Sequence, residues 1–417
     1  MKTFERILWL VAILGFIIGA YGLYDRVVNG HVNVSYGSYI PWGLWVGAYI
    51  YLIGVSAGAF LISALVYVFG IQKLANIGKL ALFTAVITLG LAMFSIFLDL
   101  GHPERAWRMI LRTNFRSMMG WMIWLYSAYF ILLIVELWFA LRGDLARWST
   151  RQDISGAIAR VLSFGKRDAS AEAAARDKRI LRVLGSIGVP LAIAFHGGVG
   201  ALFGVVGARP YWNTGLTPIM FLIGALLSGG ALLTFVTWVF GPNRGSAEHQ
   251  ETVLLLGKIT LGLLLLDVLL EWAEYSIGLY SAIPSDAASM ELVLFGPYWW
   301  AFWIFHIGLG VLVPVTLLVL FRNSSWAAAL AGLFIAFTFF TVRLNIVIPG
   351  LAVPELEGLR NAFTGPGLDF DYFPTLTEWL LQIWIISAGV LAFLIGYRLL
   401  PIVPERQTAL SAETARE

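Results

Sequence analysis

Three acidic residues are spaced so that one helix face would carry all of them. Asp267, Glu271 and Glu274 lie at i, i+4 and i+7 within an apolar run, which places them on one stripe of a helix. Carboxylates held this close repel one another, an arrangement that suits proton transfer. Arg343 and His306 lie at similar depth in later apolar runs. Two interpretations stay open: a structural cluster in which Arg343 pairs with Glu271 or Asp267, and a proton route.

A second polar set lies in the first half of the chain. Asp99 and His102 end one apolar run, and His196 lies in the outer half of another. A carboxylate and imidazoles at a membrane boundary can bond the two oxygens of a quinone ring and exchange its protons. Alternatively, Asp99 and His102 cap the helix end and bind headgroups. Glu136, deep in a further run, either continues a proton path or pairs with a neighbouring Tyr or Trp.

The elements that must position these residues are membrane-spanning helices. Of 417 residues, 59% are hydrophobic and 13% are charged, against about 25% charged in soluble domains. This composition excludes a water-soluble enzyme, a nucleic-acid-binding protein and a disordered chain. A spanning helix needs about 20 apolar residues, and the runs are continuous rather than alternating, which excludes a membrane β-barrel. Ten segments qualify: 7–28, 41–69, 78–99, 118–141, 181–205, 216–240, 253–275, 297–321, 326–348 and 378–400.

Basic residues predict the orientation of the chain, because loops rich in Lys and Arg stay cytoplasmic. Nineteen Lys and Arg fall on the side of the two termini and seven on the other side. Both termini are therefore expected in the cytoplasm. The connection 142–180 is basic and helix-prone, and either lies along the inner membrane face or forms a solvated linker. The outer loop 349–377 either covers the mouth of a site or docks a partner.

Weak internal matches predict a duplication. Gly58 matches Gly229 in the second and sixth spans, and Gly78 matches Gly257 in the third and seventh, at offsets of 171 and 179 residues. A third match relates the fourth and eighth spans. We therefore expect an all-α integral membrane protein with two parallel four-helix bundles, spans 2–5 and 6–9, flanked by spans 1 and 10. The expected parts are 1–40, 41–205 with its loop 142–180, 216–348, the outer loop 349–377, and 378–417 with its cytoplasmic tail.

Cofactor chemistry is restricted by composition. The chain contains no cysteine, so it has no thiolate ligands for an iron–sulfur cluster or a structural zinc site of its own. A b-type haem in a helix bundle needs two facing histidines, and the two intramembrane candidates, His196 and His306, fall in different bundles. We expect no haem, no iron–sulfur cluster and no metal site.

The motif Asp99-Leu-Gly-His102-Pro-Glu-Arg105 carries a family resemblance. Together with the ten spans and the paired four-helix units, it makes the chain similar to the NrfD/polysulfide reductase (PsrC) membrane-subunit family, and more closely to its ten-helix HybB-like branch. Further matching motifs are Ser56-Ala57-Gly58, Arg343-Leu-Asn345, Pro354-Glu-Leu-Glu-Gly-Leu-Arg360 and Tyr372-Phe-Pro374-Thr-Leu-Thr-Glu378.

This resemblance implies a quinone-handling membrane subunit of a respiratory oxidoreductase complex. It would work with menaquinone or ubiquinone as substrate, would not be active alone, and would exchange electrons with an extracytoplasmic, ferredoxin-like iron–sulfur subunit. The implied location is a bacterial or archaeal cytoplasmic (inner) membrane. The implied quinone site comprises Asp99, His102, Arg105 and His196.

Some members of that family are thought to translocate protons, which gives the remaining polar residues an expected role. The relay candidates are Glu136, Asp267, Glu271, Glu274, His306 and Arg343. Two alternative functions stay open: a secondary transporter, and a passive membrane anchor.

Overall fold

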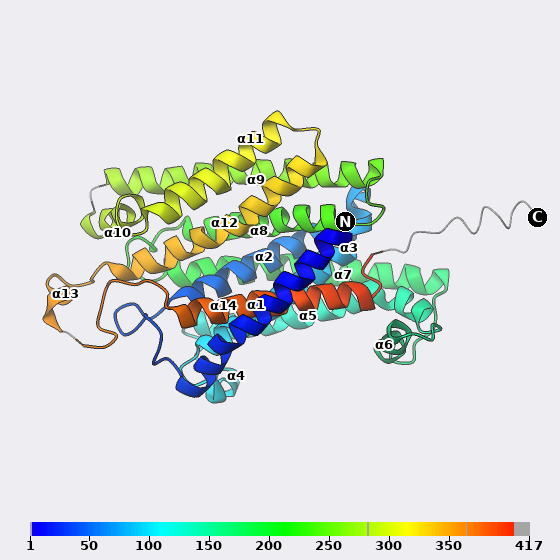
Figure 1. The fold of residues 1–417 in the computed structure, drawn as a ribbon, viewed down its shortest axis with the longest axis horizontal. Helices are drawn as coiled ribbons and strands as arrows, with labels where there is room; N and C mark the ends of the chain where they lie inside the picture. The colour runs from blue at the N-terminus through cyan, green and yellow to red at the C-terminus, as the bar shows by residue number, and fades with distance from the viewer. Residues whose placement is uncertain (1, 282, 364, 404–417) are drawn as a thin grey trace, which may run out of the picture.

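The computed structural model describes residues 2–281, 283–363 and 365–403, in which helices occur and no strand does. In this part of the chain ten helical segments are long and apolar enough to cross a membrane, which confirms the predicted fold class. All run roughly along the long axis of the molecule (Figure 1). They are α1 (Lys2–Asn29), α2 (Leu44–Tyr67), α3 (Gly78–Asp99) preceded by η1 (Gln72–Ile77), α5 (Met118–Trp148), α7 (Ala171–Gly204), α8 (Thr217–Phe240), α9 (Ala247–Tyr280), η3 (Ala301–Leu312) continued by α11 (Val313–Leu320), α12 (Ser325–Ala352) and α14 (Leu376–Leu399).

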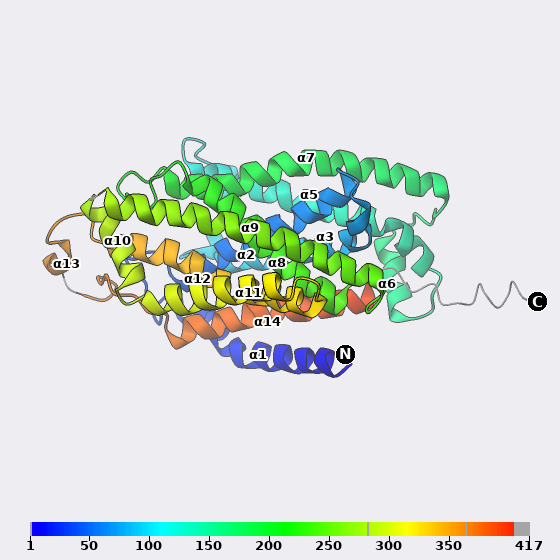
Figure 2. The same ribbon diagram turned by 90° about the horizontal axis from the view of Figure 1, so that it is seen from above.

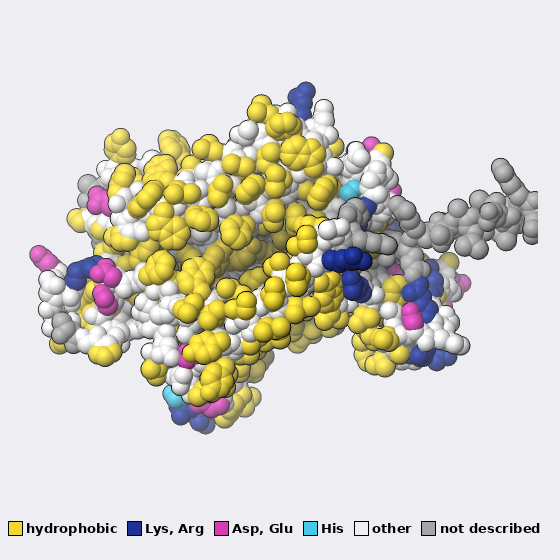
Figure 3. All heavy atoms as spheres, in the orientation of Figure 1, with side chains coloured by type: hydrophobic (Ala, Val, Ile, Leu, Met, Phe, Trp, Pro, Cys, Tyr) yellow, Lys and Arg dark blue, Asp and Glu magenta, His cyan; other side chains and the backbone are white. Residues whose placement is uncertain are grey.

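Apolar side chains cover the middle of the bundle. In the space-filling view they form a broad band, and charged groups gather at its two ends (Figure 3). Many large apolar residues in this band are exposed, such as Leu10 at 58% and Ile17 at 63% on α1. In water such a surface would be unfavourable, whereas in a bilayer it faces hydrocarbon. The protein is a multi-pass membrane protein.

The helices form two groups of four that meet along α2 and α8. The first group is α2, α3, α5 and α7, and the second is α8, α9, η3–α11 and α12. At the crossing, a Cβ added to Gly58 would lie 2.8 Å from the Cα of Gly229 and against the carbonyl oxygen of Ala225. Only glycine permits this approach of two backbones. The two glycines matched by the predicted duplication thus contact each other, while the duplication itself remains a prediction.

The first and last spans lie side by side on the outside of the two groups (Figure 2). Arg398 near the end of α14 pairs with Glu5 near the start of α1 at 2.8 Å, so both spans have these ends on the same side of the bundle. We call this the basic end and the other the opposite end. The predicted tail beyond residue 403 lies outside the described residues.

The basic connection is largely helical, and its position relative to the membrane face remains a prediction. α5 continues to Trp148, the short α6 (Ile154–Leu162) follows, and α7 starts at Ala171 and runs without a break into its span. The hydroxyl of Ser170 caps α7 by accepting from the amide of Ala173 at 3.2 Å. Ala, Glu and Arg are strong helix formers, so the helix extends beyond its apolar part.

The loop between α12 and α14 folds across the opposite end. It contains the short α13 (Leu359–Ala362), and the carbonyl of Gly367 accepts a hydrogen bond from the amide of Ser38 at 2.8 Å. Farther along, Phe370 stacks on Tyr39 with ring centroids 4.5 Å apart. This loop therefore covers the end of α2. The remaining short helices are η2 (Pro103–Arg105), α4 (Trp107–Leu111) and α10 (Pro284–Leu294).

The eighth span begins as a π-helix. In η3 the amide of Val313 bonds the carbonyl of Gly308, five residues earlier. Pro314 follows directly, and proline has no amide hydrogen and clashes with the carbonyl four residues before it. A wider turn upstream relieves that clash. His306 lies within this widened segment.

Candidate functional site

Asp99 lies at the last position of α3, at the opposite end of the first group. Its Oδ1 accepts a hydrogen bond from the Tyr36 hydroxyl at 2.9 Å. Arg26 holds the end of the same helix, because its Nε and Nη2 donate to the carbonyls of Leu98 and Leu100 at 2.5 and 2.6 Å. Arginine thus satisfies carbonyls that have no partner inside the helix. The carboxyl group of Asp99 is therefore held between the Tyr36 phenol and a helix end that Arg26 fixes in place.

His31 lies beside Tyr36, the phenol that donates to this carboxyl group, and was not predicted. Its ring centroid is 5.5 Å from that of Tyr36 and 6.1 Å from that of Trp45, and its buried Nε2 has no hydrogen-bond partner. Burial, with a contribution from the charge of Arg26, lowers the pKa of His31 to about 4. The imidazole is therefore neutral at neutral pH.

Glu378 is the second acid of this cluster. It is fully buried and accepts from the Tyr372 hydroxyl and the Thr375 amide, both at 2.7 Å. The Tyr372 oxygen in turn accepts from the amide of Leu44 at 2.7 Å. Burial and the nearby carboxylate raise the pKa of Tyr372, so it stays a hydrogen-bond donor. We call Asp99, Tyr36, His31 and Glu378 the rim cluster.

The other residues of the Asp99 motif lie on the surface. The His102 side chain is 65% exposed, and its Nδ1 is 3.0 Å from Glu104. Arg105 is 3.5 Å from the same carboxylate and is 55% exposed. The backbone turns at Leu100 into an extended conformation, which carries His102 out of the bundle. Among the described residues, His102 and Arg105 make no hydrogen bond or ion pair with Asp99.

His196 lies in the interior where the two groups meet. It is fully buried, and its Cε1 is 3.5 Å from the position that a Cβ on Gly54 would take. Neither ring nitrogen makes a hydrogen bond of good geometry. The ring of Phe221 lies beside it at 6.4 Å. The imidazole thus packs against α2 at Gly54.

The structure does not bring His196 to Asp99. The Ser56 hydroxyl donates to the carbonyl of Ala85 at 2.8 Å, which fixes how α2 lies beside α3. Gly54 is then level with about residue 87, twelve residues from Asp99. At 1.5 Å per residue this is about 18 Å along the helix axis, so one quinone ring cannot touch both groups. The expected site is thus separated into a part at the rim, with Asp99, and a part in the interior, with His196.

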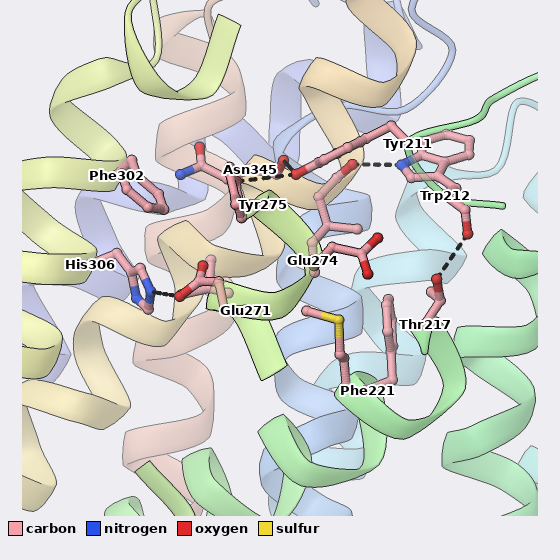
Figure 4. A pocket seen from close by; sticks show the side chains of 13 residues that line it. Tyr211, Trp212, Thr217, Phe221, Glu271, Glu274, Tyr275, Phe302, His306 and Asn345 are labelled. Atoms are coloured by element: carbon pink, nitrogen blue, oxygen red, sulfur yellow. Dashed lines mark hydrogen bonds and ion pairs between the residues drawn. The ribbon is translucent and has the colours of Figure 1, made fainter. Parts of the chain in front are cut away.

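The second group holds a pair formed by an acid and a histidine. His306 Nε2 lies 2.6 Å from Glu271 Oε2, and their side chains are only 5% and 15% exposed. The pair lines one side of a small cavity, and Glu274 lies on the other side, towards Thr217 (Figure 4). Asp267, one turn before Glu271, is buried at 8% exposure. Of the predicted stripe on α9, Glu271 and Glu274 thus line this cavity, and Asp267 lies buried one turn away.

The size of this cavity indicates its contents. Its volume is about 60 Å³, whereas a cavity of about 150 Å³ is needed to hold a benzene ring. A single water needs only about 10–15 Å³ on the same kind of measure. The cavity therefore suits a few water molecules between carboxylates and an imidazole, and not a quinone ring.

Arg343 does not make the expected ion pair. Its Nη2 donates to the carbonyl of Phe221 at 3.3 Å, and its guanidinium lies 4.5 Å and 5.0 Å from the ring centroids of Phe221 and Phe339. No carboxylate lies within 4 Å of it in the described chain, and Asp267 acts on it only at longer range. The partner of Glu271 is His306, so the ion pair of Arg343 with Glu271 or Asp267, one of the two interpretations left open, is not seen.

Glu136 is a buried acid without a partner for one of its oxygens. It is 1% exposed, and its Oε1 makes no hydrogen bond. The same oxygen lies 3.3 Å from the position of a Cβ on Gly188 in α7. The expected pairing with a tyrosine or tryptophan is not seen for this oxygen, which leaves it available to a water or a proton.

Comparison with known proteins identifies the family. Residues 33–355 match the family described as "Polysulphide reductase, NrfD". The chain belongs to this family. The resemblance recognised from the Asp99 motif is thereby confirmed.

Three relatives are named as parts of reductases or oxidoreductases. The chain is 36% identical over 408 residues to a selenate reductase subunit of Mesobacillus selenatarsenatis, covering 96% of this chain and 94% of the relative. It is 26% identical to the Hdr-like menaquinol oxidoreductase integral membrane subunit of Archaeoglobus fulgidus, covering 95% and 94%. It is 24% identical to the integral membrane subunit of the menaquinone reductase of Nitratidesulfovibrio vulgaris, covering 95% and 92%.

Proposed function

We propose that this protein is the quinone- or quinol-interacting membrane subunit of a respiratory oxidoreductase complex. It would exchange electrons with an iron–sulfur subunit on the extracytoplasmic side, which we assign to the opposite end of the bundle. The observation that supports this proposal is the rim cluster, where a carboxyl group, a phenol and a neutral imidazole converge at a membrane boundary. The relatives named for menaquinol and menaquinone lend further support.

The chemistry proposed for the rim cluster is proton exchange with the carrier ring. Oxidation of a quinol releases two electrons and two protons, and reduction of a quinone takes up the same. Asp99 would bond one ring oxygen and take or give its proton, while Tyr36 orients the carboxyl group. His102, exposed at the same end, would pass that proton to or from the aqueous side, and Arg105 would act only through its permanent positive charge. The second ring oxygen would exchange its proton directly with water at this end. The electrons would leave to, or arrive from, the iron–sulfur subunit.

For the interior residues we propose proton transfer rather than contact with the ring. Because His196 lies about 18 Å deeper than Asp99, we assign it to the network around Arg343 at the junction of the two groups. Glu271, His306 and the water-sized cavity at Glu274 would continue this network to the opposite end. Asp267 and Glu136 would be further proton-carrying groups of this network. Proton translocation by this route is part of the proposal.

Replacement of Asp99 by Asn tests the proposed function. In the assembled complex, Asp99→Asn should abolish quinol-linked turnover while the partner subunits still co-purify. Asp369→Asn is the matched control, because Asp369 is an exposed acid at the same end whose Oδ1 accepts only a local amide. That control should keep full turnover.

Two outcomes would favour the alternative functions. Full turnover in a complex carrying Ala at both Asp99 and His102 would indicate a passive anchor. Solute uptake by vesicles that contain this chain alone would indicate a secondary transporter. Either result would end the assignment of the rim cluster.

A further inference from the structure

A second, larger cavity lies at the basic end, far from the rim cluster. It has a volume of about 330 Å³ and is enclosed by the end of α2, η1, α5 and α7. Gly143 of α5 forms part of its wall, and a Cβ added there would meet nothing within 4 Å. The cavity is therefore open space next to the helices, several times larger than the water-sized cavity of the second group.

The acidic side chains in its lining are already neutralised. Asp144 pairs with both Lys79 and Arg147. Asp177 pairs with the buried Arg142, whose Nε lies 2.6 Å from Oδ2. The charge of each carboxylate is thus compensated, while Oδ1 of Asp177 makes no hydrogen bond.

Two cations in the lining have no such partner. Lys178 and Arg182 lie at i and i+4 on α7, so they project from one helix face, and both line the cavity. No carboxylate of the described chain lies within 4 Å of either one. With Arg147 on the facing helix, they give the cavity an excess of positive charge and several N–H donors.

Apolar side chains lie next to this cavity at the end of α2. Phe69, adjacent in sequence to the lining residue Gly70, is 66% exposed. Tyr67 lines the inner wall, and tyrosine is enriched at the boundary between headgroups and hydrocarbon. A ligand bound here would place an anionic part among the cations and an apolar part beside the end of α2.

We propose that this cavity binds the phosphate group of an anionic phospholipid. Arg and Lys side chains bind phosphate oxygens through charge-assisted hydrogen bonds, and basic pockets between membrane helices on the cytoplasmic side suit such headgroups. The adjoining apolar surface favours a lipid over free phosphate. The bound lipid would fix η1 and the start of α7 at the basic end.

Lipid binding to the purified, delipidated full-length protein tests this proposal. Native mass spectrometry would count phosphatidylglycerol molecules retained, and thermal stability would be compared in nanodiscs of phosphatidylcholine alone and of equal parts phosphatidylcholine and phosphatidylglycerol. Inorganic phosphate is added in a separate arm. We expect one retained phosphatidylglycerol, stabilisation only in the mixed nanodiscs, and no displacement by phosphate.

Two charge-matched double variants separate this site from general attraction. Lys178→Gln with Arg182→Gln should weaken phosphatidylglycerol binding about tenfold or more. Arg176→Gln with Arg179→Gln removes the same charge from exposed positions of α7 outside the cavity and should leave binding unchanged. If the cavity double variant fails to fold, Lys178→Gln alone gives a smaller loss in the same assay.

Three results would overturn the proposal. Equal weakening in both double variants would show unspecific attraction to the basic end. Displacement of the lipid by inorganic phosphate would show a site for the free anion. Retention of phosphatidylcholine as readily as phosphatidylglycerol would show that the cations do not select the ligand.

Discussion

The contact between α2 and α8 leads to a test with a matched control, the change of Gly58 to Ala. The added methyl group would lie against the carbonyl oxygen of Ala225, 2.8 Å from the Cα of Gly229 and 3.1 Å from the carbonyl carbon of Ala225. All three are backbone atoms, so no side chain can rotate away and the two helices must separate. Overpacking of this kind costs about 1–3 kcal/mol.

Helix propensity offsets part of this cost. Alanine is better than glycine in a helix by about 0.5–1 kcal/mol, so Gly58→Ala should lower the free energy of unfolding by about 1–2 kcal/mol. The control is Gly90→Ala in the middle of α3, where an added Cβ meets nothing within 4 Å. Gly90→Ala changes only the helix propensity, so its free energy of unfolding should rise by up to about 1 kcal/mol.

Unfolding in a titration of sodium dodecyl sulfate, followed by near-ultraviolet circular dichroism of the tryptophans, measures both variants. We expect changes of opposite sign for the same chemical substitution. If Gly58→Ala were as stable as Gly90→Ala, the close approach of α2 and α8 would not exist in the folded protein.

Three further predictions concern charged and polar groups. Arg142→Leu leaves the buried Asp177 without its partner and should destabilise the protein by about 3–5 kcal/mol, whereas Arg142→Leu with Asp177→Leu should restore most of the loss in the same titration. The pKa of His31 is about 4 in the folded state and 6.5 without burial, so between these pH values the unfolded chain binds one more proton than the folded chain. Thermal stability should therefore fall as the pH is lowered from 6.5 to 4. The fall should be smaller in His31→Phe, which lacks the titrating group. Tyr36→Phe removes only the hydroxyl that donates to Asp99 and should reduce quinol-linked turnover about two- to tenfold. Unchanged turnover would show that the phenol does not position the carboxyl group.

The sequence predicts the spans well and their ends less well. Hydropathy detects the part of a helix that lies in hydrocarbon, and the ten apolar runs correspond to the ten spans. Hydropathy does not detect where a helix continues beyond its apolar part. α7 begins ten residues before the predicted 181, because the stretch from Ala171 onwards has high helix propensity and a serine cap. α9 is likewise extended at both ends, to Ala247 and Tyr280.

The interior acids show what spacing can and cannot establish. The i, i+4, i+7 pattern correctly places Asp267, Glu271 and Glu274 on one helix face. It does not determine which basic residue lies opposite, because the rotation of α12 and η3 about their own axes depends on packing. Arg343 turns towards the rings of Phe221 and Phe339, and His306 from the π-helical turn reaches Glu271 instead.

Of the rim cluster, the sequence predicts only Asp99 as a site residue, and Glu378 enters only as part of a family motif. Asp99 stands in a recognisable motif at a helix end, whereas His31 and Tyr36 lie in the irregular segment between α1 and α2. No periodicity applies to such a segment, so its side chains cannot be assigned to a face. The only signal in the sequence is the presence of a histidine and a tyrosine near a membrane boundary.

The predicted duplication implies that corresponding positions of the two groups carry different polar residues. When Gly78 of α3 is aligned with Gly257 of α9, the three acids of α9 correspond to small residues of α3, and Asp99 corresponds to a glycine. The pairs are Asp267 with Thr88, Glu271 with Ala92, Glu274 with Ser95, and Gly278 with Asp99.

This correspondence has a packing reason. On α3, Thr88 and Ser95 satisfy their hydroxyls on backbone carbonyls, at 2.8 Å to Thr84 and 3.0 Å to Trp45, which lets α2 lie close and leaves no room for water. On α9 the same face carries carboxylates against the widened η3, where the water-sized cavity lies. The first group thus has its acid at the end of α3, whereas the acids of α9 lie farther inside, next to a cavity of the size of a few water molecules.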